Sequence, residues 1–318
     1  MGRTTTTAAT TTTAFVTGAT GLIGTALVRV LVARGHRVYG LTRSVEAAQR
    51  VRRAGAVPVM GNLLEPGLWQ DVAAADWVFH LPPPSACGLY VTNRAAGTMS
   101  EARVSMDRHL LDALSGVATR RIVYAASACA YGATGPIPVT EDAPPRPSAW
   151  GRTLAPALDR LDGYLVTGLP IVTALPGWVY GNGSWFRDRV LEPILAGRPV
   201  LQIGAPGPWV SPIHVTDCAR ALTHLAERGA VGGRYFLVND EAIRATDFAS
   251  EFARVANRPL RVRRLPAVAI RLAGGSVSAD YFRADGLFSN IRLRGLGFRF
   301  EYPTLEAGLQ EVLRALHE

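Results

Sequence analysis

The chain has 318 residues, 48% of them hydrophobic and 19% charged, so it can bury a sizeable core and is not largely disordered. Its net charge of +9 comes from 34 basic residues, all of them arginine, which are scattered and lack the aromatic-interleaved stripe typical of nucleic-acid binding. No apolar run reaches the roughly 18 residues of a membrane span, and the three cysteines lack metal-ligand spacing, so we expect a cytoplasmic protein that binds no nucleic acid, membrane or metal.

Residues 1–13 are mostly threonine and are expected to form a disordered tail. Apolar, β-rich runs then alternate with helical patterns. The expected strands are residues 14–17, 38–41, 57–60, 77–80, 122–125 and 171–174. The helices expected between them are residues 22–33, 46–53, 101–114 and 151–165. Alternation of this kind, with continuously apolar strands, predicts an α/β fold with a doubly wound, parallel Rossmann sheet.

From about residue 177 the alternation breaks down, and glycine and proline become dense. Helices are expected again at residues 245–256 and 305–316. We therefore expect residues 14–176, completed by residues 213–240, to form the Rossmann domain. Residues 177–212 and 241–318 are expected to form a smaller C-terminal substrate lobe.

A glycine-rich segment, Thr17-Gly18-Ala19-Thr20-Gly21-Leu22-Ile23-Gly24, lies between the first expected strand and the first expected helix. Glycines there allow a tight turn and let backbone N–H groups approach a pyrophosphate at the positive end of the helix. Strand, turn, helix and position agree, so the segment predicts dinucleotide binding. The residues expected to contact the dinucleotide are Gly18, Thr20, Gly21, Leu22, Ile23 and Gly24.

The end of the second expected strand bears on the choice between NAD and NADP. An NAD site usually has an acidic residue about 20 positions after the glycine loop. The first acidic residue of this chain is Glu46, beyond the strand, whereas Arg43 and Ser44 stand at its end. A guanidinium can hold a 2′-phosphate through charge-assisted hydrogen bonds, so NADP(H) is favoured. A solvated surface charge is the other interpretation of Arg43.

Several later segments, taken in order with the glycine loop, resemble the extended branch of the short-chain dehydrogenase/reductase family, the epimerase and dehydratase group. They are Gly61-Asn62-Leu63, Phe79-His80-Leu81, the run from Tyr124 to Gly132, the run from Pro176 to Gly181, the run from Ile213 to Asp217, and Tyr302-Pro303-Thr304. The resemblance implies a catalytic role for Ser127. It also adds Asn62, Leu63, Leu81, Pro82 and Pro176 to the residues expected to contact the cofactor.

The chain departs from this family where the family carries a catalytic tyrosine and, four residues later, a lysine. By the resemblance, the tyrosine position is Trp150 and the lysine position is Leu154, and the chain contains no lysine. Arg103 falls at the position of the family's helical asparagine. Of the family's four catalytic residues only Ser127 remains, so the usual proton relay is expected to be absent. The run Pro82-Pro83-Pro84 is a second departure, at the nicotinamide end of the site.

The resemblance also places four tryptophans in segments that wall the substrate cleft: Trp150, Trp178, Trp185 and Trp209. Relatives that bind sugar nucleotides tend to have an arginine just before the His-Val-x-Asp segment, whereas residues 208–212 here carry no charge. We therefore expect Ser127 and these tryptophans to contact an apolar, flat or polycyclic small molecule.

Together these features predict an atypical NADP(H)-dependent oxidoreductase of secondary metabolism that works without the tyrosine and lysine. Ser127 can still polarise a carbonyl for hydride transfer. Two alternatives stay open. One is a redox-neutral cyclase, dehydratase or isomerase that keeps NADP(H) as a structural cofactor, and the other is a non-catalytic NADP(H) sensor. The family often dimerises through a helical face, so a homodimer is left open, and the sequence does not determine the oligomeric state.

Overall fold

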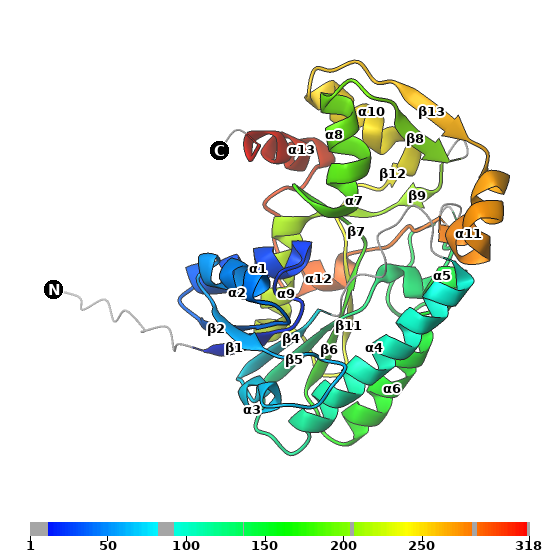
Figure 1. Ribbon diagram of the computed structural model, residues 1–318. Coiled ribbons are helices and arrows are strands. Elements are labelled where there is room, and N and C mark those ends of the chain that lie inside the picture. Colours follow the sequence, from blue (N-terminus) through cyan, green and yellow to red (C-terminus); the bar gives the residue numbers. More distant parts are fainter. Residues whose placement is uncertain (1–11, 82–91, 136, 204–206, 282–284, 317–318) are drawn as a thin grey trace.

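Seven parallel strands form the central sheet of the computed structural model, which describes residues 12–81, 92–135, 137–203, 207–281 and 285–316 (Figure 1). Every neighbouring pair in this sheet is parallel. In spatial order the strands are β3 (Val57–Met60), β2 (Arg37–Thr42), β1 (Thr13–Val16), β4 (Trp77–His80), β5 (Arg121–Ala125), β6 (Ile171–Pro176) and β11 (Arg234–Leu237). The α/β Rossmann fold expected from the sequence is confirmed.

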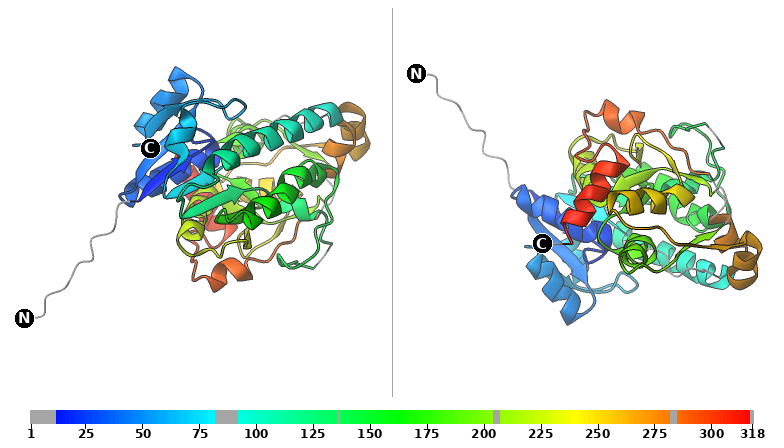
Figure 2. Two further views of the ribbon diagram at one scale, coloured as in Figure 1. Left: turned by 90° about the horizontal axis from the view of Figure 1, so that it is seen from below. Right: turned by 90° about the horizontal axis from the view of Figure 1, so that it is seen from above.

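Helices cover both faces of this sheet because successive strand residues point to opposite faces. In β1, Ala14 and Val16 face one core and Phe15 faces the other. The first core is covered by α1 (Leu22–Ala33), α2 (Val45–Arg53), α9 (Val215–Arg228) and α12 (Ile291–Gly295). The second is covered by α3 (Trp69–Ala73), α4 (Asn93–Leu114) and α6 (Ala155–Val166). Figure 2 shows α4 and α6 side by side on their face.

Most expected elements appear within a few residues of their expected bounds, with two corrections. Helix α4 begins at Asn93, eight residues before the expected start. The helix expected over residues 151–165 is two helices, α5 (Ala149–Arg152) and α6, because Leu154 is the N-cap of the second one and Pro156 stands in its first turn. Strand β11 and the full helix α9 were not predicted.

A smaller part of the molecule is built from three two-stranded pairings and short helices. The pairs are β7 (Trp178–Tyr180) with β10 (Pro212–His214), β8 (Val200–Ile203) with β13 (Val262–Leu265), and β9 (Trp209–Val210) with β12 (Ile243–Arg244). The helices are α7 (Ser184–Phe186), a π-helical turn (Arg187–Leu191), α8 (Glu192–Leu195), α10 (Ala245–Val255), α11 (Ala267–Tyr281) and α13 (Leu305–Arg314). Its own core gathers Tyr180, Phe186, Phe248, Phe252 and Leu309.

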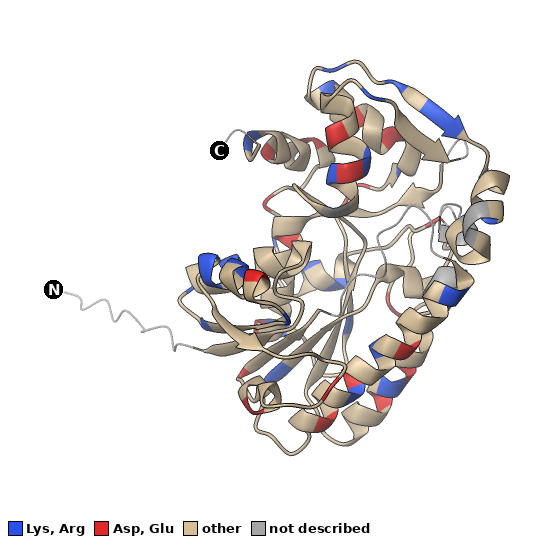
Figure 3. Ribbon diagram, viewed as in Figure 1, with Lys and Arg blue, Asp and Glu red and all other residues tan. Residues whose placement is uncertain are grey.

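Positions of acidic and basic residues alternate along the helices that cover the sheet (Figure 3). Among the described residues, no helix is both long enough and apolar enough to cross a bilayer.

Candidate cofactor and active site

The turn between β1 and α1 is built from glycines that the surrounding backbone requires. Gly18 has a φ of +64°, and a Cβ atom there would overlap the carbonyl oxygen of Leu81. A Cβ atom at Gly24 would overlap the carbonyl oxygen of Gly18. At Gly21, by contrast, a Cβ atom would meet only the Gly18 oxygen, at 3.4 Å. The protein therefore fills the space beside Gly18 and Gly24 and leaves room in front of Gly21.

Helix α1 begins directly after Gly21, beside this open space. Its N-cap is Gly21, no side chain from the described part of the chain caps it, and its first turn has no acidic residue. Helices α2 and α13 are instead capped by the hydroxyls of Ser44 and Thr304. Uncapped N–H groups at the positive end of a helix attract an anion, so this turn fits the pyrophosphate of a dinucleotide.

The adenosine end of the expected site lies at the end of β2. Arg43 is exposed, and no described residue forms a hydrogen bond or ion pair with it. Ser44 differs, because its oxygen accepts a hydrogen bond from the Ala47 N–H at 3.2 Å. The pKa of Glu46 is lowered by hydrogen bonds that its carboxylate accepts from the Glu46 backbone N–H and from the Ser44 hydroxyl. Ser44 is thus engaged in capping α2, which leaves Arg43 as the free group at this end.

The segment expected beside the adenine is held by one hydrogen bond within itself and one contact to helix α4. The side-chain oxygen of Asn62 accepts from the Leu64 N–H at 3.2 Å. Leu63 is buried, and its carbonyl oxygen lies 2.8 Å from Nδ1 of His109 on α4. Pro176 is the buried last residue of β6, whereas Pro82 lies outside the described residues.

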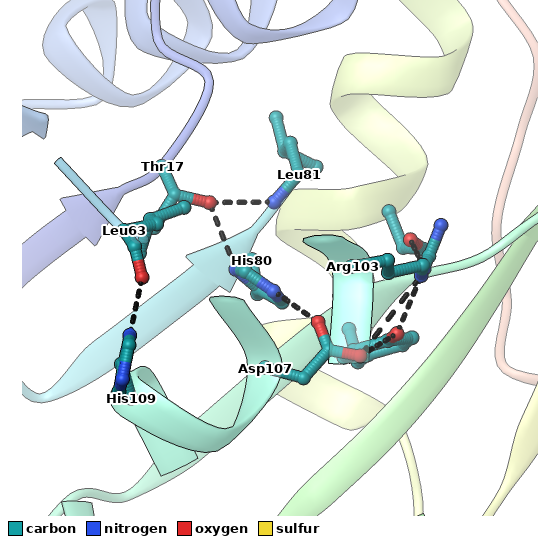
Figure 4. A network of polar contacts seen from close by, with 9 residues as sticks. Thr17, Leu63, His80, Leu81, Arg103, Asp107 and His109 are labelled. Atoms are coloured by element: carbon teal, nitrogen blue, oxygen red, sulfur yellow. Dashed lines mark hydrogen bonds and ion pairs between the residues drawn. The ribbon is translucent and has the colours of Figure 1, made fainter. Parts of the chain in front are cut away.

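A buried polar network joins the phosphate loop to strand β5 (Figure 4). The Thr17 hydroxyl accepts from the Leu81 N–H at 3.0 Å and lies 2.9 Å from Nδ1 of His80. Nε2 of His80 lies 2.7 Å from Oδ1 of Asp107, whose other oxygen accepts from the Tyr124 hydroxyl at 2.7 Å. Each ring nitrogen of His80 therefore has a partner, the Thr17 hydroxyl at Nδ1 and Asp107 at Nε2.

Arg103 extends this network to the end of β5. Its Nε donates to the Tyr124 oxygen at 2.9 Å, and its Nη2 donates to the Ala125 carbonyl at 3.0 Å. Burial raises the pKa of Tyr124, so its phenol stays protonated and acts as a donor. Ala125 is the last residue of β5 and stands two positions before Ser127. Arg103 therefore fixes the strand end that leads to Ser127.

Ser127 stands at the start of a 3₁₀ turn, Ala128–Tyr131. Its oxygen accepts from the Cys129 backbone N–H at 3.4 Å and from the Cys129 thiol at 3.1 Å. Both contacts use lone pairs of the hydroxyl, so its proton remains available for an acceptor outside the chain. The side chain is half-buried, and it can therefore donate to a bound molecule.

Helix α5, which carries Trp150, packs directly against this turn. A Cβ atom at Gly151 would overlap the carbonyl oxygen of Cys129, so only glycine permits the approach. Leu154 is buried, with 5% of its surface exposed. The side chain of Trp150 is not among those that the structure describes.

The remaining tryptophans have different surroundings. Trp185 packs edge-on against Phe186 and Phe248 in the core of the smaller part, and its Nε1 donates to the Val179 carbonyl at 2.9 Å. Trp178 packs edge-on against Trp185, with ring centroids 5.0 Å apart. Packing thus accounts for Trp185.

Trp209 has a charged neighbour that the sequence did not indicate. The guanidinium carbon of Arg244 lies 4.4 Å from the centroid of the Trp209 ring. Residues 208–212 carry no charge themselves, but the pairing of β12 with β9 brings one to them. The segment before the His-Val-x-Asp sequence is thus uncharged, as expected, and it lies beside a guanidinium from another strand.

A parallel Rossmann sheet, a glycine turn and an uncapped first helix define a dinucleotide-binding α/β protein. Residues 14–238 match the NAD dependent epimerase/dehydratase family. The chain belongs to that family, within the extended short-chain dehydrogenases/reductases, and the family is NAD(P)-dependent.

Among curated proteins, the chain is 31% identical over 314 residues to a 3-diazoavenalumate denitrifying reductase of a Streptomyces species, covering 92% of this chain and 98% of that protein. It is 26% identical over 265 residues to a 4-hydroxy-2-methyl-3-oxo-4-farnesyl-3,4-dihydroquinoline-1-oxide ketoreductase of Stigmatella aurantiaca, covering 81% and 78% of the two chains. These distant relatives are reductases of secondary metabolism.

Solved structures share the fold at low sequence identity. A UDP-glucuronic acid 4-epimerase from Bacillus cereus, in complex with UDP-glucuronic acid and NAD, has a TM-score of 0.80 at 18% identity, over 96% of this chain and 99% of that one. A dTDP-glucose 4,6-dehydratase from Bacillus anthracis, in complex with NAD, has a TM-score of 0.80 at 16% identity, over 96% of each chain.

Proposed function

We propose that the protein is an NADP(H)-dependent reductase of a largely apolar secondary metabolite, which works without a tyrosine–lysine proton relay. One arrangement carries this proposal: buried hydrogen bonds join the phosphate loop at Thr17 to the strand end that leads to Ser127. A sensor would need the loop alone. Coupling it to a half-buried serine whose proton is free is what an enzyme requires, because reacting groups must be held in register.

Each described group has a distinct task in this proposal. The N–H groups that begin α1 bind the pyrophosphate, and Arg43 binds the 2′-phosphate. A bound nicotinamide cofactor supplies a hydride. Ser127 donates a hydrogen bond to the acceptor, and α5 lies against the turn that follows Ser127. Leu154 stands where the relay would place a lysine. It is apolar and buried, so it supplies no proton to the substrate.

Without a tyrosine–lysine proton relay, the site suits a hydride acceptor whose product does not have to be protonated. A ketone that gains a hydride becomes an alkoxide and must be protonated. An arenediazonium ion that gains a hydride gives the arene and N₂, with no net uptake of a proton. The Streptomyces relative is named for a diazo compound and for denitrification, which supports testing nitrogen-based acceptors beside ketones.

The cofactor part is tested by titrating NADPH and NADH while tryptophan fluorescence is followed. Charge-assisted hydrogen bonds from Arg43 are worth about 1.5–3 kcal/mol, so NADPH should bind about tenfold to a hundredfold more tightly than NADH. Arg43→Ala should remove that difference, and Arg53→Ala, an exposed arginine at the end of α2, should leave it unchanged. Equal affinities in the unaltered protein would refute the assignment of NADP(H).

The reductase part is tested by following NADPH consumption with a panel of aryl ketones and arenediazonium salts. We expect consumption with at least one class. With a ketone, Ser127→Ala should lower turnover about 10²–10³-fold without loss of NADPH affinity, because the developing oxyanion loses a hydrogen-bond donor. Turnover of an acceptor without NADPH consumption would instead establish a redox-neutral enzyme.

A further inference from the structure

An arginine occupies the N-cap of α10, a position where it gains nothing from the helix. Arg244 has the extended φ/ψ of an N-cap residue, and no side-chain cap bond is formed there by the part of the chain that is described. Helices α2, α4 and α13 use Ser44, Thr92 and Thr304 at the same position. A cation near the positive end of a helix is also electrostatically unfavourable. Local structure therefore does not explain Arg244.

The surroundings of Arg244 hold its guanidinium from one side. Its Nη1 donates to the Gly207 carbonyl at 3.1 Å and lies 3.7 Å from Oδ1 of Asp285. The same Asp285 oxygen accepts from the Trp209 backbone N–H at 2.8 Å. Nε and Nη2 of Arg244 have no partner within the described ranges, and 31% of the side chain is exposed. One guanidinium nitrogen is thus held by the chain, and the side chain as a whole is partly exposed.

This pair is tied to the segment that follows Ser127. The Thr134 N–H donates to the Asp285 carbonyl at 3.0 Å, and the Gly286 N–H donates to the Trp209 carbonyl at 2.7 Å. The Leu287 N–H donates to the Thr134 hydroxyl at 2.9 Å. Strand β7, which follows β6 past the carboxyl end of the sheet, leads into the same part of the molecule (Figure 1). The backbone beside Trp209 is therefore hydrogen-bonded through residues 285–287 to Thr134, seven positions after Ser127.

We propose that Arg244 and Trp209 bind an aromatic monocarboxylate, with the guanidinium on the carboxylate and the indole against the aromatic ring. A guanidinium offers two parallel donors to a carboxylate, and an indole ring gives a large flat contact. Asp285 offsets part of the positive charge, so one negative charge matches the site better than a diphosphate does. This inference rests on the proposed function, because it assigns the substrate of that same site to the aromatic acids.

The test uses trans-cinnamate and 2-naphthoate as probes, with their primary amides as neutral matches. Each is titrated by calorimetry into the full-length protein saturated with NADP⁺. We expect a Kd of about 1 mM or tighter for at least one acid, and binding at least about tenfold weaker for its amide. Arg244→Gln should reduce the acid to the affinity of the amide, and Trp209→Leu should weaken acid and amide together. Arg263→Gln, an exposed arginine on β13, is the control and should change neither.

A second variant guards against a folding defect in Arg244→Gln. Asp285→Asn removes the competing carboxylate and keeps an acceptor for the Trp209 N–H, so it should tighten binding of the acid but not of the amide. Three results would overturn the inference. They are equal binding of acid and amide, no binding of either acid, and tighter binding of UDP than of the acids at Arg244. NADPH affinity, measured on the same samples, separates the two claims. If the unaltered protein does not bind NADPH, the proposed function is refuted. If it binds NADPH but neither acid, only the carboxylate site is refuted.

Discussion

Nε2 of His80 lies 2.7 Å from Oδ1 of Asp107, and neither side chain is more than 3% exposed. The pair connects strand β4, which packs against the phosphate loop, with helix α4. Asp107 also accepts from Tyr124, so a single carboxylate satisfies donors from two neighbouring strands. Removing it would leave both donors unpaired in a place that water does not reach.

Asp107→Leu should therefore lower the free energy of unfolding by about 2–6 kcal/mol, because each of the two donors left unpaired costs about 1–3 kcal/mol. Tyr124→Phe removes two hydrogen bonds of the same network, to Asp107 and from Arg103, and should cost about 1–3 kcal/mol. Tyr164→Phe is the control, because its hydroxyl donates to Asp112 at the surface and should contribute less than about 1 kcal/mol. Urea unfolding of the three variants gives these values. Similar losses for Asp107→Leu and Tyr164→Phe would contradict the role given to the network.

Two alanine substitutions in the glycine turn should separate folding from cofactor binding. Gly24→Ala places a methyl group on the Gly18 carbonyl, so it should destabilise the protein. Gly21→Ala meets only one oxygen at 3.4 Å, and Gly21 has an ordinary φ of −75°, so it should fold normally but bind NADPH weakly. Gly97→Ala, in an open position on α4, should raise stability by about 0.5–1 kcal/mol. Thermal unfolding with and without NADPH measures both effects, and tight NADPH binding by Gly21→Ala would argue against a pyrophosphate there.

The double change Trp150→Tyr with Leu154→Lys should create alcohol oxidation with NADP⁺, which the unaltered protein should lack. A lysine at the buried position of Leu154 would be desolvated, which lowers its pKa and costs stability. Neither single variant supplies a complete relay, so each serves as a control. Turnover of simple secondary alcohols by the unaltered protein at about 1–1,000 per second would show that the relay is not needed.

Glu141 should make stability fall as pH rises above the acid range. Its side chain is fully buried, its Oε1 accepts from the Phe236 N–H at 2.6 Å, and burial raises its pKa. The folded state therefore holds the carboxyl proton more tightly than the unfolded state does. Its contribution to stability is fully present below the ordinary pKa and is lost as pH rises through the folded pKa.

Glu141→Gln keeps an acceptor for the Phe236 N–H and cannot ionise. Its stability relative to the unaltered protein should rise with pH across that window, as measured by urea unfolding between about pH 4 and pH 8. Asp142→Asn, the exposed neighbour that also contacts Arg292, is the matched control. A difference between Glu141→Gln and the unaltered protein that stays constant with pH would count against a raised pKa.

Features that depend on neighbouring residues were predictable, and features that depend on distant pairing were not. Residues 22–33, 57–60 and 77–80 have the expected bounds because continuous apolar or periodic runs end at turns. The first turns of α4 carry few buried residues, only Ala96 before Met106, so periodicity missed its start.

The same distinction holds for the residues of the candidate site. The glycine turn and Ser127 lie in local segments whose spacing can be read directly from the sequence. The contact of Arg244 with Trp209 depends on the pairing of two strands of two residues each, 33 or more positions apart, which leave no periodic pattern. The Asp107 network likewise joins helix and strand residues that no motif connects.

The order in which the chain is made has a consequence for the outer edge of β6. That edge is paired by β11, about 60 residues later, and the apolar face of α1 is covered by α9, which also comes after β6. At a synthesis rate of about 5–20 residues per second, the nascent chain presents an unpaired apolar strand and an uncovered helix for roughly 3–12 s. The outer edge of β6 stays unpaired until Leu237 has left the ribosome, and α12, which completes the first core, is made later still. A chaperone that binds nascent apolar segments would therefore find a target here.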